Sequence, residues 1–460
     1  MEREKIEEIL KTQKTYYRED RTLSYESRIK ALDALYSSIM KYSDALRAAL
    51  KEDLGKSEAE SDMCEIRLTL SEITYLRKHL RRWMKEKRVH TPLSQFASRS
   101  FTRPLPYGNT LIMSPWNYPV LLTLEPLADA LAAGNTAVLK PSAYSSSTTK
   151  VLKDMITETF DSGLVAIVDG GRDENAALLE CNFDYIFFTG SKSVGKLVME
   201  KAAKHLTPVT LELGGKSPCI VTKDADLPLA AKRIAFGKLI NCGQTCVAPD
   251  YILVEKTVQK EFEDLLKSEI IKMTGENPLE STEWGKIINI KHFSRVIKLL
   301  DDRKTILGGK YDEKTLKIEP TVLSGVSFSD PVMQEEIFGP IFPVIPFDDL
   351  DECIDYINSN EHPLALYIFT EKKKKESDYV MTHTLFGGGC INDTLIHLAT
   401  SEMPFGGVRE SGMGGYHGRS GFDSFSHYTS IVDKKTWMDL PMRYRPYTEK
   451  NRRLINFFLK

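Results

Sequence analysis

The spacing of hydrophobic residues divides the chain into two kinds of sequence. Over residues 1 to about 89, apolar positions recur every three to four residues, as at Ile29, Leu32 and Leu35, which is the period of an amphipathic helix. Gly55 and residues 22–24 interrupt this pattern, which argues against a continuous coiled coil. We therefore expect several separate helices that pack against a sheet.

From about residue 110, short apolar runs alternate with helical stretches. The predicted strands are residues 110–113, 136–140, 164–168, 185–188 and 209–213, and the helices between them are residues 120–133, 145–160 and 193–204. This alternation is typical of βαβ units with a parallel sheet covered on both faces. It restarts after about residue 215, with strands near 219–221, 251–254, 341–345 and 365–369. Two α/β domains in series are the simplest account.

Composition and charge narrow the class of protein. The 460 residues are 42% hydrophobic and 27% charged, as in an ordinary globular protein of two or three domains. Lys and Arg number 62 against 64 Asp and Glu, and this balance argues against nucleic acid as a partner. The N-terminus lacks a signal-like apolar stretch, and the apolar run 119–133 contains Glu125 and Asp129 and is too short to span a bilayer. Seven sparse cysteines fit a reducing compartment, so we expect a cytoplasmic protein with no transmembrane anchor.

Two strand ends are candidates for a nucleotide site. Gly190 follows an apolar strand and opens a helix that contains Gly195, and helix N-termini attract phosphate. The spacing is not the usual GxGxxG fingerprint, so an ordinary strand–helix turn explains it equally well. Lys140 ends another strand, at the edge where open parallel sheets bind ligands, although a lysine at a strand end is usually only solvated.

Three further motifs carry groups suited to acyl transfer. Glu212 lies in residues 211–217 before a glycine pair, Cys246 lies in the small-residue loop 243–248, and Asn117 lies in residues 114–119. A thiol can attack a carbonyl carbon, a carboxylate can act as general base, and an amide can stabilise an oxyanion. A free cysteine is more often buried filler, and spacing alone does not show that the three groups meet.

Motifs in six places, in the same order along the chain, resemble the aldehyde dehydrogenase superfamily over nearly its whole length. They are residues 116–119, 188–191, 211–217, 243–248, 335–340 and 404–407. Residues 404–407 and 411–418 are most similar to the class 3, or fatty aldehyde dehydrogenase, branch.

The resemblance implies an α/β fold with a Rossmann-like cofactor domain, a second α/β catalytic domain and a small oligomerisation element. The implied boundaries are 1–87 and 107–213 for the NAD(P)-binding domain, 88–106 and 417–445 for the oligomerisation segments, 214–416 for the catalytic domain and 446–460 for a C-terminal tail. A homodimer is expected, with an interface near 88–106 and 432–441. The basic tail is too short to span a membrane and is expected to pack on the protein or on a partner subunit.

The resemblance also assigns roles to single residues. Cys246 would attack the aldehyde to give a thiohemiacetal and then a thioester, Glu212 would activate the water that hydrolyses it, and Asn117 would stabilise the oxyanion together with the backbone N–H of Cys246. The implied cofactor contacts are Lys140, Gly190, Ser191, Gly195, Glu336, Phe338 and Trp116, and the implied substrate pocket includes Tyr118 and Phe405.

Glu212 favours hydrolytic oxidation of medium- to long-chain aliphatic or aromatic aldehydes to carboxylic acids, because acylating relatives typically lack this carboxylate. The alternatives are a catalytically idle relative that serves as a binding or structural protein, and a thiol esterase without redox chemistry. Ala143 stands where the family often has a glutamate that repels a 2′-phosphate, so we expect NAD or NADP, with NADP tolerated and its preference open. Cys242 lies four residues before Cys246 without a companion Cys or His cluster, so no metal is expected.

Overall fold

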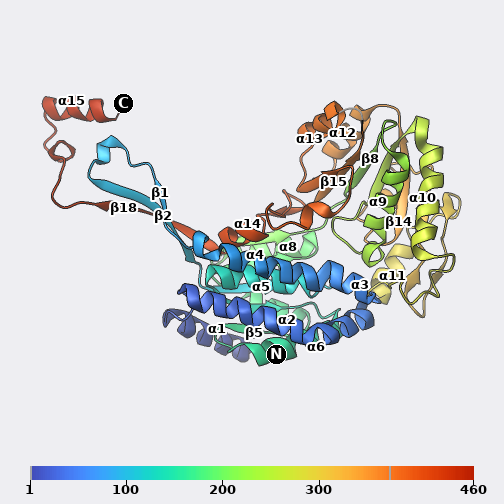
Figure 1. Cartoon of the computed structure of the whole chain (residues 1–460), viewed down its shortest axis with the longest axis horizontal. Helices are drawn as coiled ribbons and strands as arrows, with labels where there is room; N and C mark the ends of the chain where they lie inside the picture. The colour runs from blue at the N-terminus through green and yellow to red at the C-terminus, as the bar shows by residue number, and fades with distance from the viewer. Residues whose placement is uncertain (1–2, 372–373, 460) are drawn as a thin grey trace.

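The computed structural model describes residues 3–371 and 374–459. Two α/β bodies lie side by side, and a narrow β-arm projects from one of them, carrying the C-terminal helix at its far end (Figure 1). The bodies contain a six-stranded and a seven-stranded sheet. The predicted strands and helices are present with bounds that differ by only a few residues, so the expected α/β fold is confirmed.

The N-terminal segment forms helices that cover the first body. They are α1 (Arg3–Arg18), α2 (Tyr25–Leu54), α3 (Glu58–Ser61) and α4 (Arg67–Trp83), with a π-helical turn at Asp62–Ile66. Ser24 caps α2 by accepting a hydrogen bond from the backbone N–H of Ser27 at 3.0 Å, and Gly55 ends it with a φ of 71°. Helices α2 and α4 pack on the helices that cover one face of the first sheet.

The six-stranded sheet is parallel except for one short edge strand. Its order is β17 (Gly412–Met413), β7 (Val209–Glu212), β6 (Tyr185–Thr189), β3 (Asn109–Met113), β4 (Thr136–Lys140) and β5 (Val165–Ile167). The helices around it are α5 (Leu121–Ala133), α6 (Ser146–Thr159), α7 (Arg172–Leu179) and α8 (Lys192–Ala203). On β3, Ile112 packs into one hydrophobic cluster, while Leu111 and Met113 pack into the other. Successive residues therefore serve opposite faces of a sheet that is buried on both sides.

The strand register aligns the carboxyl ends of this sheet. Met113 pairs with both Lys140 and Phe188, and Thr189 pairs with Glu212. The chain order reverses beside β3, since β4 and β5 lie on one side of it and β6 and β7 on the other. Ligands bind at such a switch point in open α/β sheets. The register thus brings four segments that the sequence singled out to one edge of the sheet, namely those with Asn117, Lys140, Gly190 and Glu212.

The seven-stranded sheet is parallel except for the pairing of β10 with β13. Its order is β10 (Thr305–Leu307), β13 (Thr321–Leu323), β14 (Ile341–Phe347), β9 (Tyr251–Glu255), β8 (Pro218–Val221), β15 (Ala365–Phe369) and β16 (Gly388–Ile391). Its helices are α9 (Leu227–Leu239), α10 (Gln259–Thr274), α11 (Ile290–Ile297), α12 (Leu350–Ser359) and α13 (Lys374–His383), and β11 (Tyr311–Asp312) and β12 (Lys317–Ile318) form a separate hairpin. Short 3-10 turns lie at Leu93–Gln95, Ile240–Gly243, Lys256–Val258, Pro331–Met333, Ile396–Leu398 and Pro441–Arg443.

The projecting arm is a three-stranded antiparallel sheet of β1 (Lys87–Val89), β2 (Ser98–Pro106) and β18 (Ser426–Lys434). Helix α14 (Gly418–Ser424) leads into it, and α15 (Glu449–Phe458) lies beyond its far end (Figure 1). The arm contains much of the segments that the sequence assigned to oligomerisation, and that role stays a prediction.

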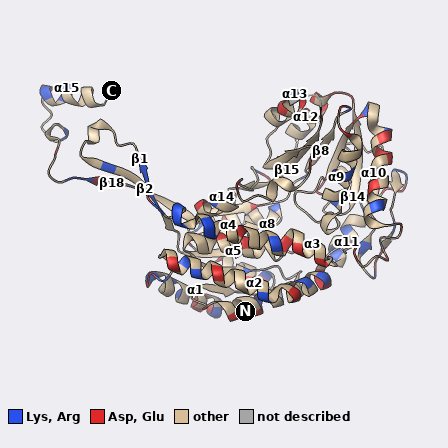
Figure 2. Ribbon diagram, viewed as in Figure 1, with Lys and Arg blue, Asp and Glu red and all other residues tan. Residues whose placement is uncertain are grey.

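Charged residues of both signs are interspersed along the outer helices, such as α2 and α10 (Figure 2). Among the described residues, no helix combines the length and the apolar character that crossing a membrane requires.

Candidate active site

The loop that carries Cys246 has a constrained backbone. After α9, the turn Ile240–Gly243 holds Asn241 and Cys242 each at a φ of 52°. Gly243 has a φ of 74°, and a Cβ there would lie 2.3 Å from the backbone oxygen of Gly339, so only glycine fits. The Cys246 side chain that follows is half-buried.

Cys246 rests as a thiol. Burial raises its pKa to about 12, and the carboxyl groups of Glu336 and Glu212 add to this effect. A thiolate therefore forms only with a proton acceptor or a positive charge nearby. The same interactions show that Cys246 shares its surroundings with both carboxyl groups, so the structure brings the predicted thiol and carboxylates together.

Asn117 lies against the cysteine loop. Its Nδ2 donates to the backbone oxygen of Gln244 at 3.1 Å. Asn241 Nδ2 donates in turn to the backbone oxygens of Asn117, at 2.8 Å, and of Gln244, at 3.1 Å. Three residues thus join the loop after β3 to the loop before β9. The predicted amide and thiol are neighbours, although they are 129 positions apart in the chain (246 − 117).

A buried ion pair between Lys56 and Glu65, which the sequence did not indicate, supports the loop that carries Asn117. Lys56 and Glu65 are 1% and 0% exposed, and Lys56 Nζ lies 2.5 Å from Glu65 Oε1. Lys56 Nζ also donates to the backbone oxygen of Asn117 at 2.8 Å. Both residues come from the N-terminal helical segment, which contains many surface lysines and glutamates. Nothing in the sequence distinguishes Lys56 and Glu65 from these surface residues.

Glu212 ends β7 with its side chain 2% exposed, and neither of its carboxyl oxygens has a hydrogen-bond partner among the described residues. Burial raises its pKa well above the usual range. The backbone passes close by, because a Cβ at Gly406 would lie 3.2 Å from Glu212 Oε1. An unpartnered buried carboxyl group is costly to maintain, and it is available to bind water or substrate.

Glu336 reaches the glycine pair that follows Glu212. A Cβ at Gly214 would lie 2.2 Å from Glu336 Oε2, so the carboxyl group occupies space that any other residue would fill. Burial and Asp250 raise the pKa of Glu336 to about 8, against an opposing hydrogen bond from Gly215. Phe338 has a φ of 48°, and its ring meets that of Trp116 edge-on at 5.4 Å between centroids.

The predicted cofactor residues line the edge where the strands of the first sheet end. Ser191 is the N-cap of α8, and its side chain makes no capping hydrogen bond, so the first N–H groups of α8 are available to an anion. Gly190 approaches its own strand closely, since a Cβ there would lie 2.6 Å from the Phe188 ring, and one at Gly195 would lie 2.7 Å from Leu213. This tight, glycine-lined turn at a helix N-terminus fits a dinucleotide phosphate.

Lys140 ends β4 with its side chain 3% exposed. Its Nζ donates to the backbone oxygens of Pro141 and Gly170, each at 2.8 Å. Burial lowers the pKa of Lys140. These two carbonyls hold the ammonium group at the same strand-end edge as the α8 turn.

A cavity of about 300 Å³ leads to Cys246. The two predicted pocket residues, Tyr118 and Phe405, both line it, and so does Thr245. Tyr118 Oη and Thr245 Oγ1 are 2.5 Å apart. Apolar side chains make up most of the remaining wall, namely Met63, Leu68, Leu121, Leu122, Phe236, Ile240, Val247, Leu395, Ile396 and Leu398. Met63, Phe236 and Ile396 are 48%, 38% and 56% exposed, so the cavity opens to solvent among apolar side chains.

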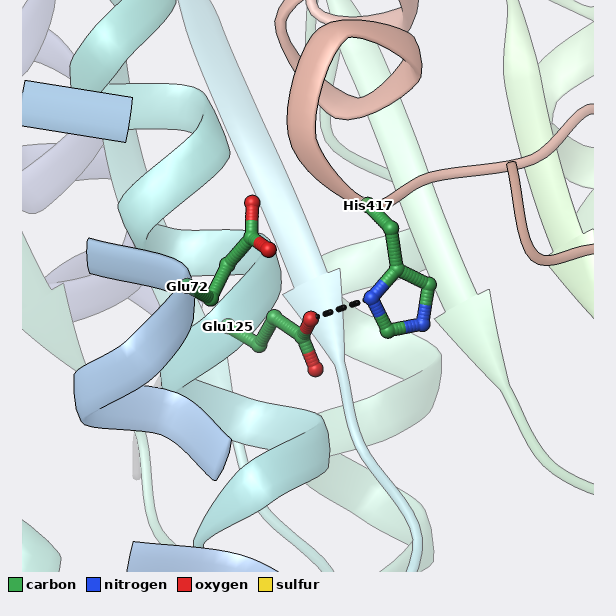
Figure 3. A group of neighbouring side chains, drawn as sticks. All are labelled: Glu72, Glu125 and His417. Atoms are coloured by element: carbon green, nitrogen blue, oxygen red, sulfur yellow. Dashed lines mark ion pairs between the residues drawn. The ribbon is translucent and has the colours of Figure 1, made fainter. Parts of the chain in front are cut away.

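One part of the cavity wall is polar. Glu72 on α4, Glu125 on α5 and His417 before α14 come together there (Figure 3), and one possible ligand atom from each lies within 4.8 Å of the others. His417 Nδ1 lies 2.6 Å from Glu125 Oε1. In the sequence, only Cys242 and Cys246 stood close enough together to suggest a metal site, and this group was not predicted. Its one signal was the presence of two acidic residues, Glu125 and Asp129, in a mostly apolar helix.

Two mostly parallel sheets carry a thiol that lines a cavity, two carboxyl groups near that thiol and an amide against its loop, and this arrangement defines a candidate cysteine-dependent enzyme. Comparison with known proteins identifies its family. The model of the aldehyde dehydrogenase family matches residues 1–431. The chain belongs to this family, whose members use NAD(P), and is an aldehyde dehydrogenase, an enzyme that oxidises aldehydes.

The relatives include members of family 3. The chain is 44% identical to aldehyde dehydrogenase family 3 member B1 of Mus musculus over 98% of this chain and 96% of the relative. It is 43% identical to the 4,4'-diaponeurosporen-aldehyde dehydrogenase of Staphylococcus aureus over 98% and 99% of the two chains. The solved substrate-bound structure of Staphylococcus aureus AldH superposes with a TM-score of 0.96, at 42% identity and 98% and 99% coverage. The resemblance to the class 3 branch is therefore confirmed.

Proposed function

We propose that this chain oxidises medium- to long-chain aliphatic or aromatic aldehydes to carboxylic acids, through a covalent thioester on Cys246. The observation that carries the proposal is the apolar cavity that leads from solvent to Cys246. Its lining suits a substrate with an apolar body, and its inner end holds the reactive thiol. One relative is a 4,4'-diaponeurosporen-aldehyde dehydrogenase, which supports the proposal that such a cavity accepts a large aldehyde.

The first step is loss of the Cys246 thiol proton to the Glu212 carboxylate, which passes it on to solvent, and attack by Cys246 Sγ on the aldehyde carbon, which gives a thiohemiacetal oxyanion. Asn117 Nδ2 carries two N–H groups, one of which donates to Gln244. The other N–H, together with the backbone N–H of Cys246, is assigned to the oxyanion. Because Asn241 and Gln244 hold both loops, these donors need little reorganisation during the reaction.

The residues assigned to NAD(P) are Lys140, Gly190, Ser191 and Gly195 at the strand-end edge and Trp116, Glu336 and Phe338 nearer to Cys246. The bound cofactor supplies the acceptor for the hydride that leaves the substrate carbon. The carbon is thereby oxidised to a thioester that remains bonded to Cys246 Sγ.

Glu212 then acts as the general base for hydrolysis. A carboxylate with a raised pKa accepts a proton more readily at neutral pH than an exposed one. It takes a proton from water, the water oxygen adds to the thioester carbon, and the C–S bond breaks to release the carboxylic acid. Both oxygens of Glu212 are free of hydrogen bonds to other described residues, so a water molecule can bind there.

The experiment is rapid-mixing measurement of reduced cofactor with octanal, dodecanal and benzaldehyde. Cys246→Ala should abolish the signal. Glu212→Gln should give about one equivalent of reduced cofactor in a burst and then stall by a factor of about 10² or more. Cys242→Ala is the matched control, because this buried thiol contacts Gly285, and it should retain turnover. Full steady turnover in Glu212→Gln would remove the assignment of the base, and silence of the wild-type enzyme with all three aldehydes would favour the idle-relative reading.

For the cofactor we propose that NADP is accepted along with NAD. Ala143 is exposed and follows Lys140 in the connection to α6, so this position presents no carboxylate to a 2′-phosphate. Ala143→Glu should raise KM for NADP about tenfold while leaving KM for NAD within about twofold. The added carboxylate would repel the 2′-phosphate of NADP, whereas it could accept a hydrogen bond from the ribose hydroxyl of NAD. Equal effects on both cofactors would reject this role for position 143.

For assembly and location we propose a cytoplasmic homodimer that pairs through the projecting arm. The arm and the segment after it expose Phe96, Val432 and Trp437, at 52%, 52% and 70%, and exposed apolar residues on an elongated sheet favour an interface. Light scattering should give a molar mass twice that of one chain, and Val432→Arg should shift the measured mass toward that of a single chain. Cell fractionation of the native protein tests the location.

A further inference from the structure

The polar part of the substrate cavity is out of keeping with the rest of its lining. Glu72, Glu125 and His417 are 2%, 2% and 7% exposed and lie among apolar and aromatic side chains. Groups of this kind cost free energy to bury and are normally satisfied by partners. Because all three side chains lie on the cavity wall, we expect them to interact with a molecule bound in the cavity.

The ring of His417 is held on three sides. Its Nδ1 is paired with Glu125 Oε1 at 2.6 Å, one face stacks on Tyr416 with centroids 4.5 Å apart, and Phe405 meets it edge-on at 5.6 Å. These contacts fix the ring plane. Nε2, which points away from both carboxyl groups in Figure 3, is the nitrogen left to bind a ligand.

Glu72 is held in a similar way. Its Oε1 accepts a hydrogen bond from the backbone N–H of Gly418 at 2.7 Å, which ties α4 to the start of α14. Its Oε2 has no partner among the described residues, and neither does Oε2 of Glu125. The wall therefore combines one fixed imidazole nitrogen with carboxyl oxygens whose bonding capacity is unused.

We propose that His417 and its partner Glu125 form a subsite that binds a hydroxyl group carried by the aldehyde substrate, away from the reacting carbon. The subsite rests on the proposed function, since it lines the same cavity as Cys246. A hydroxyl group suits the nitrogen in either protonation state, because it accepts from Nε2–H of the imidazolium and donates to Nε2 of the neutral ring. An alkyl group at this place leaves the buried nitrogen unpaired. Sites built to bind a hydroxyl discriminate against analogues that lack it for this reason.

The experiment compares kcat/KM for decanal with kcat/KM for its 6-, 7-, 8-, 9- and 10-hydroxy derivatives. At least one derivative should be favoured over decanal by about tenfold or more, which is the effect of one hydrogen bond to a charged or buried polar group. His417→Phe keeps the stacking surface and removes both nitrogens. It should abolish this preference by lowering kcat/KM for the favoured derivative about tenfold more than for decanal, and the lost preference should appear in KM rather than kcat.

Two further variants keep the test decisive. Glu125→Gln retains a partner for Nδ1 without its charge and should reduce the hydroxyl preference by an intermediate factor, even if His417→Phe folds poorly. His397→Phe is the matched control, because this histidine also lies beside Phe405, with centroids 6.1 Å apart, but is not part of the cavity wall. It should leave the preference unchanged.

Three results would overturn the subsite: no derivative favoured over decanal, an equal loss for decanal and its derivatives in His417→Phe, or a stoichiometric divalent ion in the purified enzyme that His417→Phe removes. That last result would make His417 a metal ligand instead. Failure of the proposed function is distinguishable, because it would silence decanal in the wild-type enzyme.

Discussion

The ammonium nitrogen of Lys56 donates to the backbone carbonyl oxygen of Asn117 at 2.8 Å. Glu65 completes the arrangement, since its Oε2 accepts from the backbone N–H of Val120 at 2.7 Å and of Leu121 at 3.3 Å. One buried ion pair thus holds the middle and the C-terminal end of the loop between β3 and α5. The proposed oxyanion donor is positioned by two residues that do not line the substrate cavity.

Lys56→Met should lower kcat by about 10–100-fold while leaving KM for the cofactor nearly unchanged. The side chain of Asn117 loses its fixed backbone support, and displacements of about 1 Å have effects of this size. The variant also leaves Glu65 buried without its cation, which costs about 3–5 kcal/mol of stability. Steady-state kinetics and thermal unfolding measure the two effects.

The matched variants separate position from stability. Lys56→Met combined with Glu65→Gln should recover much of the unfolding temperature, because no charge is left unpaired, but should not recover kcat. Lys51→Met, on the exposed end of α2, should behave as wild type. Recovery of kcat in the double variant would show that Lys56 acts only through stability.

Gly214→Ala should raise KM for NAD(P) by about tenfold or more. The added Cβ would lie 2.2 Å from Glu336 Oε2, so the carboxyl group must move away from the place where it is proposed to bind the cofactor. KM for the aldehyde should change little, since Gly214 does not line the substrate cavity. Fluorescence titration of the cofactor measures the effect, and a parallel rise in both KM values would point to general disruption instead.

The pH dependence of cofactor use should report Glu336. Its pKa of about 8, raised by burial and by Asp250, means that the carboxyl group is largely protonated at pH 7 and ionises as the pH rises. An ionised carboxylate accepts hydrogen bonds from ribose hydroxyls better than the acid does. Hence kcat/KM for NAD(P) should increase between about pH 7 and 9, and Glu336→Gln should be lower and lack this step. A profile that keeps the step in Glu336→Gln would assign it to another group.

Asp129→Asn should stabilise the protein at alkaline pH. Asp129 is fully buried, and neither carboxyl oxygen has a partner among the described residues. Burial, with added repulsion from Glu72 and Glu125, raises its pKa well above normal. The folded state therefore holds the proton more tightly than the unfolded chain, whose aspartates titrate near about 3.9. The contribution of Asp129 to stability is complete below that pH and is lost as the pH rises toward its raised folded-state pKa.

Asparagine imitates the protonated acid at every pH. The unfolding temperature of Asp129→Asn should exceed that of wild type by about 2 °C or more at pH 8, and the difference should shrink as the pH falls toward 5. Scanning calorimetry across this range measures it. A difference that does not vary with pH would mean that Asp129 is satisfied in a way unrelated to its charge.

The sequence by itself determined the two α/β bodies and the individual groups capable of chemistry. The alternation of apolar runs with helical stretches depends only on which faces are buried, so the positions of β3, β4, β6 and β7 followed from local pattern. The motifs around Asn117, Glu212 and Cys246 were recognisable because each occupies a short, continuous stretch.

The tertiary structure decided which groups meet. Strand register brought Lys140, Gly190 and Glu212 to one edge, and register is a property of pairing between strands. The Lys56–Glu65 pair and the group formed by Glu125 and His417 each join residues from different elements, in the second case 292 positions apart (417 − 125). Their charges look like those of ordinary surface residues in the sequence, because the cost of burying a charge exists only once neighbouring elements have closed over it.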